Sequence, residues 1–70
     1  MRTLQQQLSE IKLNSSTLHN VVTNYNMGLI TMSEKHNQLL DILSIIDNIK
    51  KGICKEYGIN TIAVNLMLTL

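Results

Sequence analysis

The sequence contains no proline, tryptophan or phenylalanine, and its 70 residues include only one cysteine, three glycines and two tyrosines. Without proline, and with so few glycines, little in the chain interrupts a helix. The lone Cys54 excludes an internal disulfide and is typical of a reducing cytosol. The hydrophobic share is nevertheless 44%, mainly Leu, Ile, Val and Met, which pack helix against helix. An all-α fold is therefore expected.

The chain also has little net charge and no long uninterrupted apolar run. The net charge is +1, so bulk electrostatics favours neither nucleic acid nor an anionic membrane as a partner. The apolar-rich stretch from Ile59 to Leu70 is shorter than the ~20 residues that a membrane span needs. The polar start from Met1 to Gln7 carries no apolar signal core. We therefore expect a cytoplasmic protein that binds no membrane. The abundance of Asn, Ile and Lys is in keeping with an AT-rich genome, such as that of a virus or phage.

The short length limits the stability of the chain. Residues 1–70 make one domain, which buries only about 60% of its unfolded surface and usually needs a disulfide, a metal or an oligomer for stability. His19, His36 and Cys54 are scattered, without the i, i+4 or C-x-x-C spacing that presents two metal ligands together. No metal or cofactor is therefore expected, and self-association remains as the source of stability.

Apolar residues recur along most of the chain at alternating spacings of four and three. The series is Leu4, Leu8, Ile11, Ser15, Leu18, Val22, Tyr25, Leu29, Met32, His36, Leu39, Leu43, Ile46, Lys50 and Ile53. This spacing is that of a coiled-coil seam. Its three polar members, Ser15, His36 and Lys50, all fall on heptad position a, where single polar residues usually set the register and the number of partners.

Capping signals divide the helical pattern into two. Thr3 to Gln6 and Thr31 to Glu34 both have capping-box spacing, with a hydroxyl at the cap and Gln or Glu three residues on. Gly28 is placed to end the first helix in a left-handed conformation. We predict helices from about Leu4 to Asn26 and from about Met32 to Lys51. The short connection between them predicts an antiparallel hairpin over about 4–51.

Two segments leave the secondary structure open. The cluster Asn14-Ser15-Ser16-Thr17 is a candidate break within the first helix. In the segment 59–70, apolar residues alternate as in a strand but fit one face of a helix equally well. Asn60 is a fair helix cap, and a lone strand would have no partner strand. We therefore predict a C-terminal helical segment within 53–70, with a β-strand as the alternative.

The second helix is more apolar than a two-stranded seam requires. A helix that is apolar over most of its circumference must be covered on several sides. A hairpin alone cannot cover it, whereas a dimer of hairpins with four helices can. The residues that we expect to bind a partner are Leu39, Leu40, Ile42, Leu43, Ile46, Ile49, Ile53 and Leu66.

The segment 50–69 carries a different pattern. A small residue, Cys54, is followed four residues later by Gly58 and then by an apolar residue, with further apolar residues at Val64 and Met67. This pattern resembles the helix-turn-helix unit of bacterial and phage DNA-binding proteins, in which the glycine reverses the chain. The resemblance implies base contacts by Asn60, Thr61 and Asn65 and phosphate contacts by Lys50, Lys51 and Lys55. Phosphate contacts supply most of the affinity for nucleic acid, and the outward face of the C-terminal helix in this unit lacks Arg and Lys. We therefore expect a protein partner in preference to nucleic acid.

Catalysis finds no support in the pattern of reactive residues. The acids Glu10, Glu34, Asp41, Asp47 and Glu56 are spread along the helices and form no close pair of the acid–base type. A Cys–His nucleophile would need an orienting group and a pocket, and no glycine-rich phosphate loop is present. We predict a non-catalytic interaction protein (a regulator, inhibitor or assembly adaptor) that binds itself and another protein. The alternative is a helix-turn-helix regulator dimerised by a coiled coil.

Overall fold

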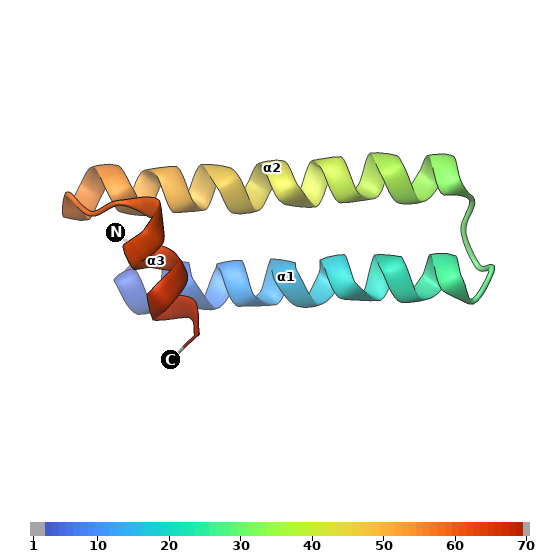
Figure 1. The fold of residues 1–70 in the computed structure, drawn as a ribbon, viewed down its shortest axis with the longest axis horizontal. Coiled ribbons are helices and arrows are strands. Elements are labelled where there is room, and N and C mark those ends of the chain that lie inside the picture. Colours follow the sequence, from blue (N-terminus) through green and yellow to red (C-terminus); the bar gives the residue numbers. More distant parts are fainter. Residues whose placement is uncertain (1–2, 70) are drawn as a thin grey trace.

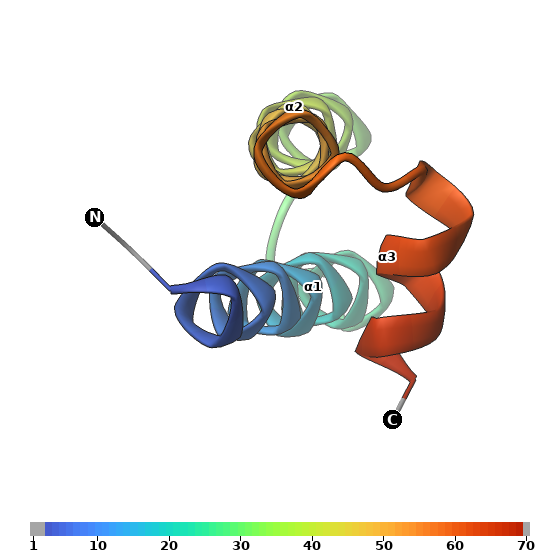
Figure 2. The same ribbon diagram turned by 90° about the vertical axis from the view of Figure 1, so that its left-hand side faces the viewer.

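Three helices make up the part of the chain described by the computed structural model, residues 3–69. They are α1 (Leu4–Asn26), α2 (Met32–Tyr57) and α3 (Thr61–Leu68). The first two pack as an antiparallel hairpin, and α3 lies across it beside the first turns of α1 (Figure 1). Seen along the hairpin, α3 covers only one side of it (Figure 2). The predicted all-α hairpin with a short C-terminal helix is confirmed.

Each helix begins at a side-chain cap that the sequence predicts. Thr3 Oγ1 accepts from the Gln6 N–H at 3.1 Å, and Gln6 Oε1 accepts from the Thr3 N–H at 2.9 Å. Thr31 and Glu34 make the same reciprocal pair, at 3.1 and 3.0 Å. Asn60 Oδ1 accepts from the backbone N–H three residues on at 2.8 Å, so residues 61–68 form a helix and not the alternative strand.

Glycines in the left-handed conformation end α1 and α2. Gly28 has φ of +77°, and its N–H donates to the Tyr25 carbonyl while the Leu29 N–H donates to the Asn24 carbonyl. Gly58 has φ of +65° at the end of α2. A side chain with a Cβ is strained at these angles, so both glycines stop their helices where they stand.

The polar cluster at residues 14–17 does not break α1. Asn14, Ser15 and Thr17 each donate a side-chain hydrogen bond to the carbonyl oxygen four residues earlier, at 2.8, 2.9 and 3.2 Å. Such side chains often compete with the helix for backbone groups. Here they bond to carbonyls of the same helix, and the helix continues through them.

Helix α2 runs to Tyr57, six residues beyond the predicted end at Lys51. Gly52 therefore lies inside the helix, where it costs about 1 kcal/mol relative to Ala. The next residue, Ile53, is fully buried, and burying an Ile side chain stabilises the fold by about 1.5–3 kcal/mol. The prediction was wrong at this point because burial in the folded chain outweighs the local preference of glycine.

The core is a row of aliphatic side chains between the helices. Its buried members are Ile11, Val21, Ile42, Ile46, Ile53 and Val64. Half-buried Leu4, Leu8, Leu18, Ile30, Leu39, Ile49, Cys54, Ile59 and Leu68 surround them. The core thus joins all three helices, and Val64 attaches α3 to the hairpin.

In this core the predicted seam of α2 is confirmed at Leu39, Ile46 and Ile53 and wrong at its a positions. On α2 the inward residues are Leu39, Ile42, Ile46, Ile49 and Ile53, whereas the predicted a residues His36 and Leu43 are exposed and Lys50 is half-buried. On α1 the predicted Ser15 is exposed as well. The correction has a simple cause. The apolar stripe of α2 is broader than one seam, so periodicity alone does not decide which of its edges faces α1.

Candidate interaction surface

More large apolar side chains are exposed than buried among residues 3–69. The buried core has six apolar members, while Leu13, Met27, Leu29, Met32, Leu40, Leu43, Ile45, Tyr57, Ile62 and Leu66 are exposed. Single exposed apolar residues are common on soluble proteins, but contiguous groups mark interaction sites. Their grouping on the surface is therefore what bears on function.

The structure divides the eight residues predicted to bind a partner. Ile42, Ile46 and Ile53 are buried within the chain, and Leu39 and Ile49 are half-buried beside them. Leu40, Leu43 and Leu66 remain 53%, 50% and 63% exposed. Only these last three present most of their side chain to a partner, and the others stabilise the hairpin itself.

One group of exposed residues follows a side of α2. Met32, Leu43 and Cys54 are spaced by eleven residues, which is close to three helical turns, so they lie along one line. Leu40 lies beside this line, one turn before Leu43. We call Met32, Leu40 and Leu43 the α2 patch. Cys54 Sγ lies 4.0 Å from Thr61 Oγ1 of α3, so α3 packs on the same side of α2 as this patch, at the opposite end of the helix.

A second group lies on α3. Ile62 and Leu66 are 69% and 63% exposed and stand one turn apart, about 180° around the helix from the fully buried Val64. We call these two residues the α3 patch. No residue of α3 is charged, and the exposed neighbours Asn65 and Thr69 are neutral. The α3 patch thus faces away from the hairpin as an uncharged apolar surface.

The hairpin tip, residues 27–31, is the third apolar region. Met27 and Leu29 are exposed there. Beside them Lys35 Nζ lies 4.0 Å from the centre of the Tyr25 ring, a cation–π contact that ties the first turn of α2 to the last turn of α1. The tip is therefore apolar at its end and held by a polar contact at its base.

The residues of the alternative nucleic-acid interface are only partly available. Asn60 Oδ1 caps α3, and Lys51 Nζ lies 2.8 Å from Asp47 Oδ2. The hydrogen bond to Asp47, together with the carboxylate charge, raises the pKa of Lys51 above its ordinary value. Lys50 is half-buried, while Lys55 and Asn65 are exposed.

The turn between α2 and α3 is anchored on both sides by buried side chains. Gly58 is left-handed, and Ile53 before it and Val64 after it are both 0% exposed. Thr61 is exposed and lies against Cys54. The outer surface of this pair of helices is the α3 patch.

A buried polar residue, Gln7, is a feature that sequence reasoning missed. Its Nε2 donates to Glu56 Oε2 at 3.3 Å, linking the first turns of α1 to the end of α2. Gln7 stands in a run of three glutamines, which carries no signal that one of them is buried. The contact is a link within the fold, since both groups lie against the core helices.

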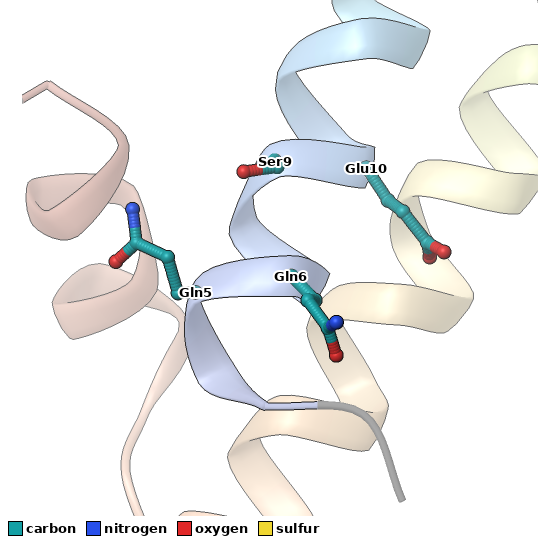
Figure 3. A pocket seen from close by; sticks show the side chains of 4 residues that line it. All are labelled: Gln5, Gln6, Ser9 and Glu10. Carbon is teal, nitrogen blue, oxygen red and sulfur yellow. The ribbon is translucent and has the colours of Figure 1, made fainter.

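A shallow hollow on the first turns of α1 holds no converging groups. Gln5, Gln6, Ser9 and Glu10 line it, all from one helix. Gln5 and Glu10 point to opposite sides of that helix (Figure 3). The four side chains therefore do not surround a common point at which a substrate could be held.

Within residues 3–69, no three His, Cys, Asp or Glu side chains gather as a metal site would require. No helix in this part of the chain is long and apolar enough to cross a membrane. No protein-family model matches the chain, and no curated protein or solved structure is significantly similar to it.

Proposed function

We propose that this protein is a small, non-catalytic interaction module that associates with itself and binds a protein partner through its exposed apolar surface. The observation that carries the proposal is the excess of exposed over buried large apolar side chains, ten against six among residues 3–69. Contiguous apolar groups such as the α2 patch and the α3 patch are common at protein interfaces. A regulator, an inhibitor or an assembly adaptor would act in this way.

Self-association follows from the size of the domain. A single core in so short a chain contributes only a few kcal/mol of net stability, and here it has six buried apolar side chains within residues 3–69. Cys54 has no second cysteine to pair with. Contact between copies would remove exposed apolar side chains from water. This burial would add to the small stability of the single chain.

Sedimentation equilibrium at micromolar concentration tests the proposal. We expect a mass of at least twice 7.9 kDa, with the helical circular dichroism expected of α1, α2 and α3. A mass of 7.9 kDa across the concentration range, with that helical signal intact, would contradict self-association.

A second candidate function is sequence-specific DNA binding. The left-handed Gly58 between two helices anchored by Ile53 and Val64 favours it. In that role Asn60, Thr61 and Asn65 would face bases, while Lys50, Lys51 and Lys55 would face phosphates. The uncharged α3 supports the protein partner instead, since phosphate contacts supply most of the affinity for DNA.

Fluorescence anisotropy with genomic DNA fragments across a salt series separates the two candidates. The interaction module predicts negligible binding at physiological salt. DNA binding predicts a steep salt dependence whose slope falls by about one for each phosphate contact removed. The Lys50→Ala/Lys51→Ala variant provides the comparison, because it removes two cations and leaves the core unchanged.

A further inference from the structure

The area that the chain exposes is larger than that of a compact monomer of its mass. The accessible surface is 5026 Å², whereas a compact protein of 7.9 kDa exposes about 4400 Å². The radius of gyration, 13.8 Å, likewise exceeds the value of about 11 Å for a compact chain of this length. A standard interface covers about 800 Å² on each partner. The excess is therefore of the size that one contact between two copies would remove.

The side of the hairpin that carries α3 has a step. Helix α3 runs across the hairpin (Figure 1), so it covers about one helix diameter, ~10 Å, of a molecule 42 Å long. The α2 patch lies on this same side and is left uncovered toward the hairpin tip. One end of the side is thus raised by α3, and the other end is lower and apolar.

This step fits a copy of itself. If two chains face each other on this side and run in opposite directions, the raised end of each meets the lower end of the other. We infer that the chain forms an antiparallel dimer with twofold symmetry, in which the α3 patch of each copy packs on the α2 patch of the other. The inference rests on the self-association proposed above and names its surface and direction. Such a contact closes on itself and leaves no end free for further growth.

The chemistry of the two patches agrees with this contact. The α3 patch is Ile62 and Leu66, and the α2 patch is Met32, Leu40 and Leu43, so both sides of the contact are mainly apolar. One polar side chain, the exposed His36, lies among the α2 patch residues, one turn from Met32 and one turn from Leu40. Polar groups lie around it, including Asn65 and Thr69 on α3 and Asp47, one turn after Leu43, on α2. Asp47 is already paired with Lys51. An apolar centre within a polar rim is the usual anatomy of a stable interface.

Single carboxylates placed in either patch test the contact. Leu66→Asp and Leu43→Asp should each raise the dimer dissociation constant about a hundredfold or more, because the twofold axis buries each new charge twice without a partner. Sedimentation equilibrium measures the constant, and circular dichroism verifies that the helices are retained. Both positions are at least half exposed in the single chain, so the fold itself should tolerate the change.

Two matched controls carry the same substitution elsewhere. Leu13→Asp lies on α1 at a residue that is 69% exposed, and it belongs to neither patch. Ile45→Asp lies on α2 at the other edge of the buried stripe, since residue 45 precedes Ile46 whereas Leu43 follows Ile42. Neither should change the dissociation constant more than about twofold. If a control substitution dissociated the dimer while Leu43→Asp and Leu66→Asp left its dissociation constant unchanged, the inferred surface would be wrong, although self-association would stand.

A mixing experiment tests the direction of packing. Leu66→Asp and Leu43→Lys should each be monomeric alone. When mixed they should form a heterodimer at least about tenfold tighter than either homodimer, because one α3–α2 contact becomes Asp–Lys and the other remains Leu–Leu. If α3 instead packed on α3, Leu43→Lys would stay dimeric alone and there would be nothing to rescue. Circular dichroism of each variant alone shows whether it is folded before mixing.

The outcomes separate the inference from the proposed function. A wild-type chain that stays at 7.9 kDa ends both. If the wild type is a dimer but Leu43→Asp and Leu66→Asp leave the dissociation constant unchanged, or mixing gives no rescue, the inferred surface is wrong while self-association stands. Ile62→Asp, one turn from Leu66, should repeat the effect of Leu66→Asp, and its failure to do so would likewise exclude α3 from the contact.

Discussion

At the end of the hairpin where α3 lies, three helices meet, while at the tip only α1 and α2 pack together. Ile11, Ile53 and Val64, at the three-helix end, are essentially fully buried. Toward the tip Val21 and Ile42 are 6% and 8% exposed, Leu18 and Leu39 are half-buried and Met32 is exposed. Two helices touch along one line and leave open grooves on either side of it. The eight residues of α3 close one such groove at one end, and that difference in cover decides how much each core side chain contributes.

The inferred dimer treats the two ends alike. With α3 of the partner on the α2 patch, the tip half of each hairpin also receives a third helix. The assembled protein would then have one continuous core, in which both ends of each hairpin are covered by a third helix.

Truncation of core residues at the two ends should cost different amounts. We expect Ile53→Ala to lower the free energy of unfolding by about 3–4 kcal/mol, because it leaves a cavity among three helices. Leu39→Ala, at a half-buried site toward the tip, should cost about 1–2 kcal/mol. Urea unfolding followed by circular dichroism measures both in the wild-type background at one protein concentration, because a monomer with only a few kcal/mol of net stability would not stay folded after the larger loss. Equal losses of stability would show that α3 does not increase the contribution of the core side chains that it covers, such as Ile53.

Replacement of His36 by Leu should strengthen association rather than the single chain. His36 is exposed, and it lies between Met32 and Leu40 on the same side of α2, so the change replaces the polar side chain within the α2 patch by an apolar one. We expect the dimer dissociation constant to fall about tenfold. Sedimentation equilibrium measures this constant. An unchanged mass and melting temperature would place His36 in solvent in the assembly too.

The caps at the two ends should also differ. Thr31→Ala removes the hydroxyl that begins α2 beside the tip, and we expect a loss of about 1 kcal/mol. Thr3→Ala removes the equivalent group at the start of α1, where the reciprocal acceptor is the neutral Gln6 and not a carboxylate, so a loss nearer about 0.5 kcal/mol is expected. Thermal unfolding of the two variants compares them. A larger loss at Thr3 would indicate that the first turn of α1 is held more tightly than the tip.

The smallest difference concerns pH. Hydrogen bonds from the Thr31 backbone and side chain hold the pKa of Glu34 below its usual 4.5, whereas the other capping box has the neutral Gln6. The stabilisation from Glu34 is therefore fully present above pH 4.5 and is lost as the pH falls through the lower folded-state pKa. Carboxyl carbon shifts in an NMR titration give that pKa. The difference in stability between wild type and Glu34→Gln should shrink on acidification, and a constant difference would contradict the prediction.

Much of the fold was predictable because its signals are local. Thr3, Thr31 and Asn60 begin their helices through hydrogen bonds to N–H groups three residues away, and Gly28 ends α1 by adopting angles that other residues avoid. Such interactions depend on the immediate neighbours alone, so they can be recognised without knowing the fold. The candidate surface was less predictable, since only Leu40, Leu43 and Leu66 of its eight expected members are well exposed.

The sequence by itself therefore determined the two long helices, where each of them begins, where α1 ends and the apolar nature of α2, and it left a strand open as the alternative for residues 59–70. Only the tertiary structure decided that α2 continues through Gly52, and that Ile42 and Ile49 face inward in place of the expected Leu43 and Lys50. The physical reason is the same in each case. These choices depend on which side of a broad apolar helix is covered by α1 and α3, and that cover comes from residues distant in the chain.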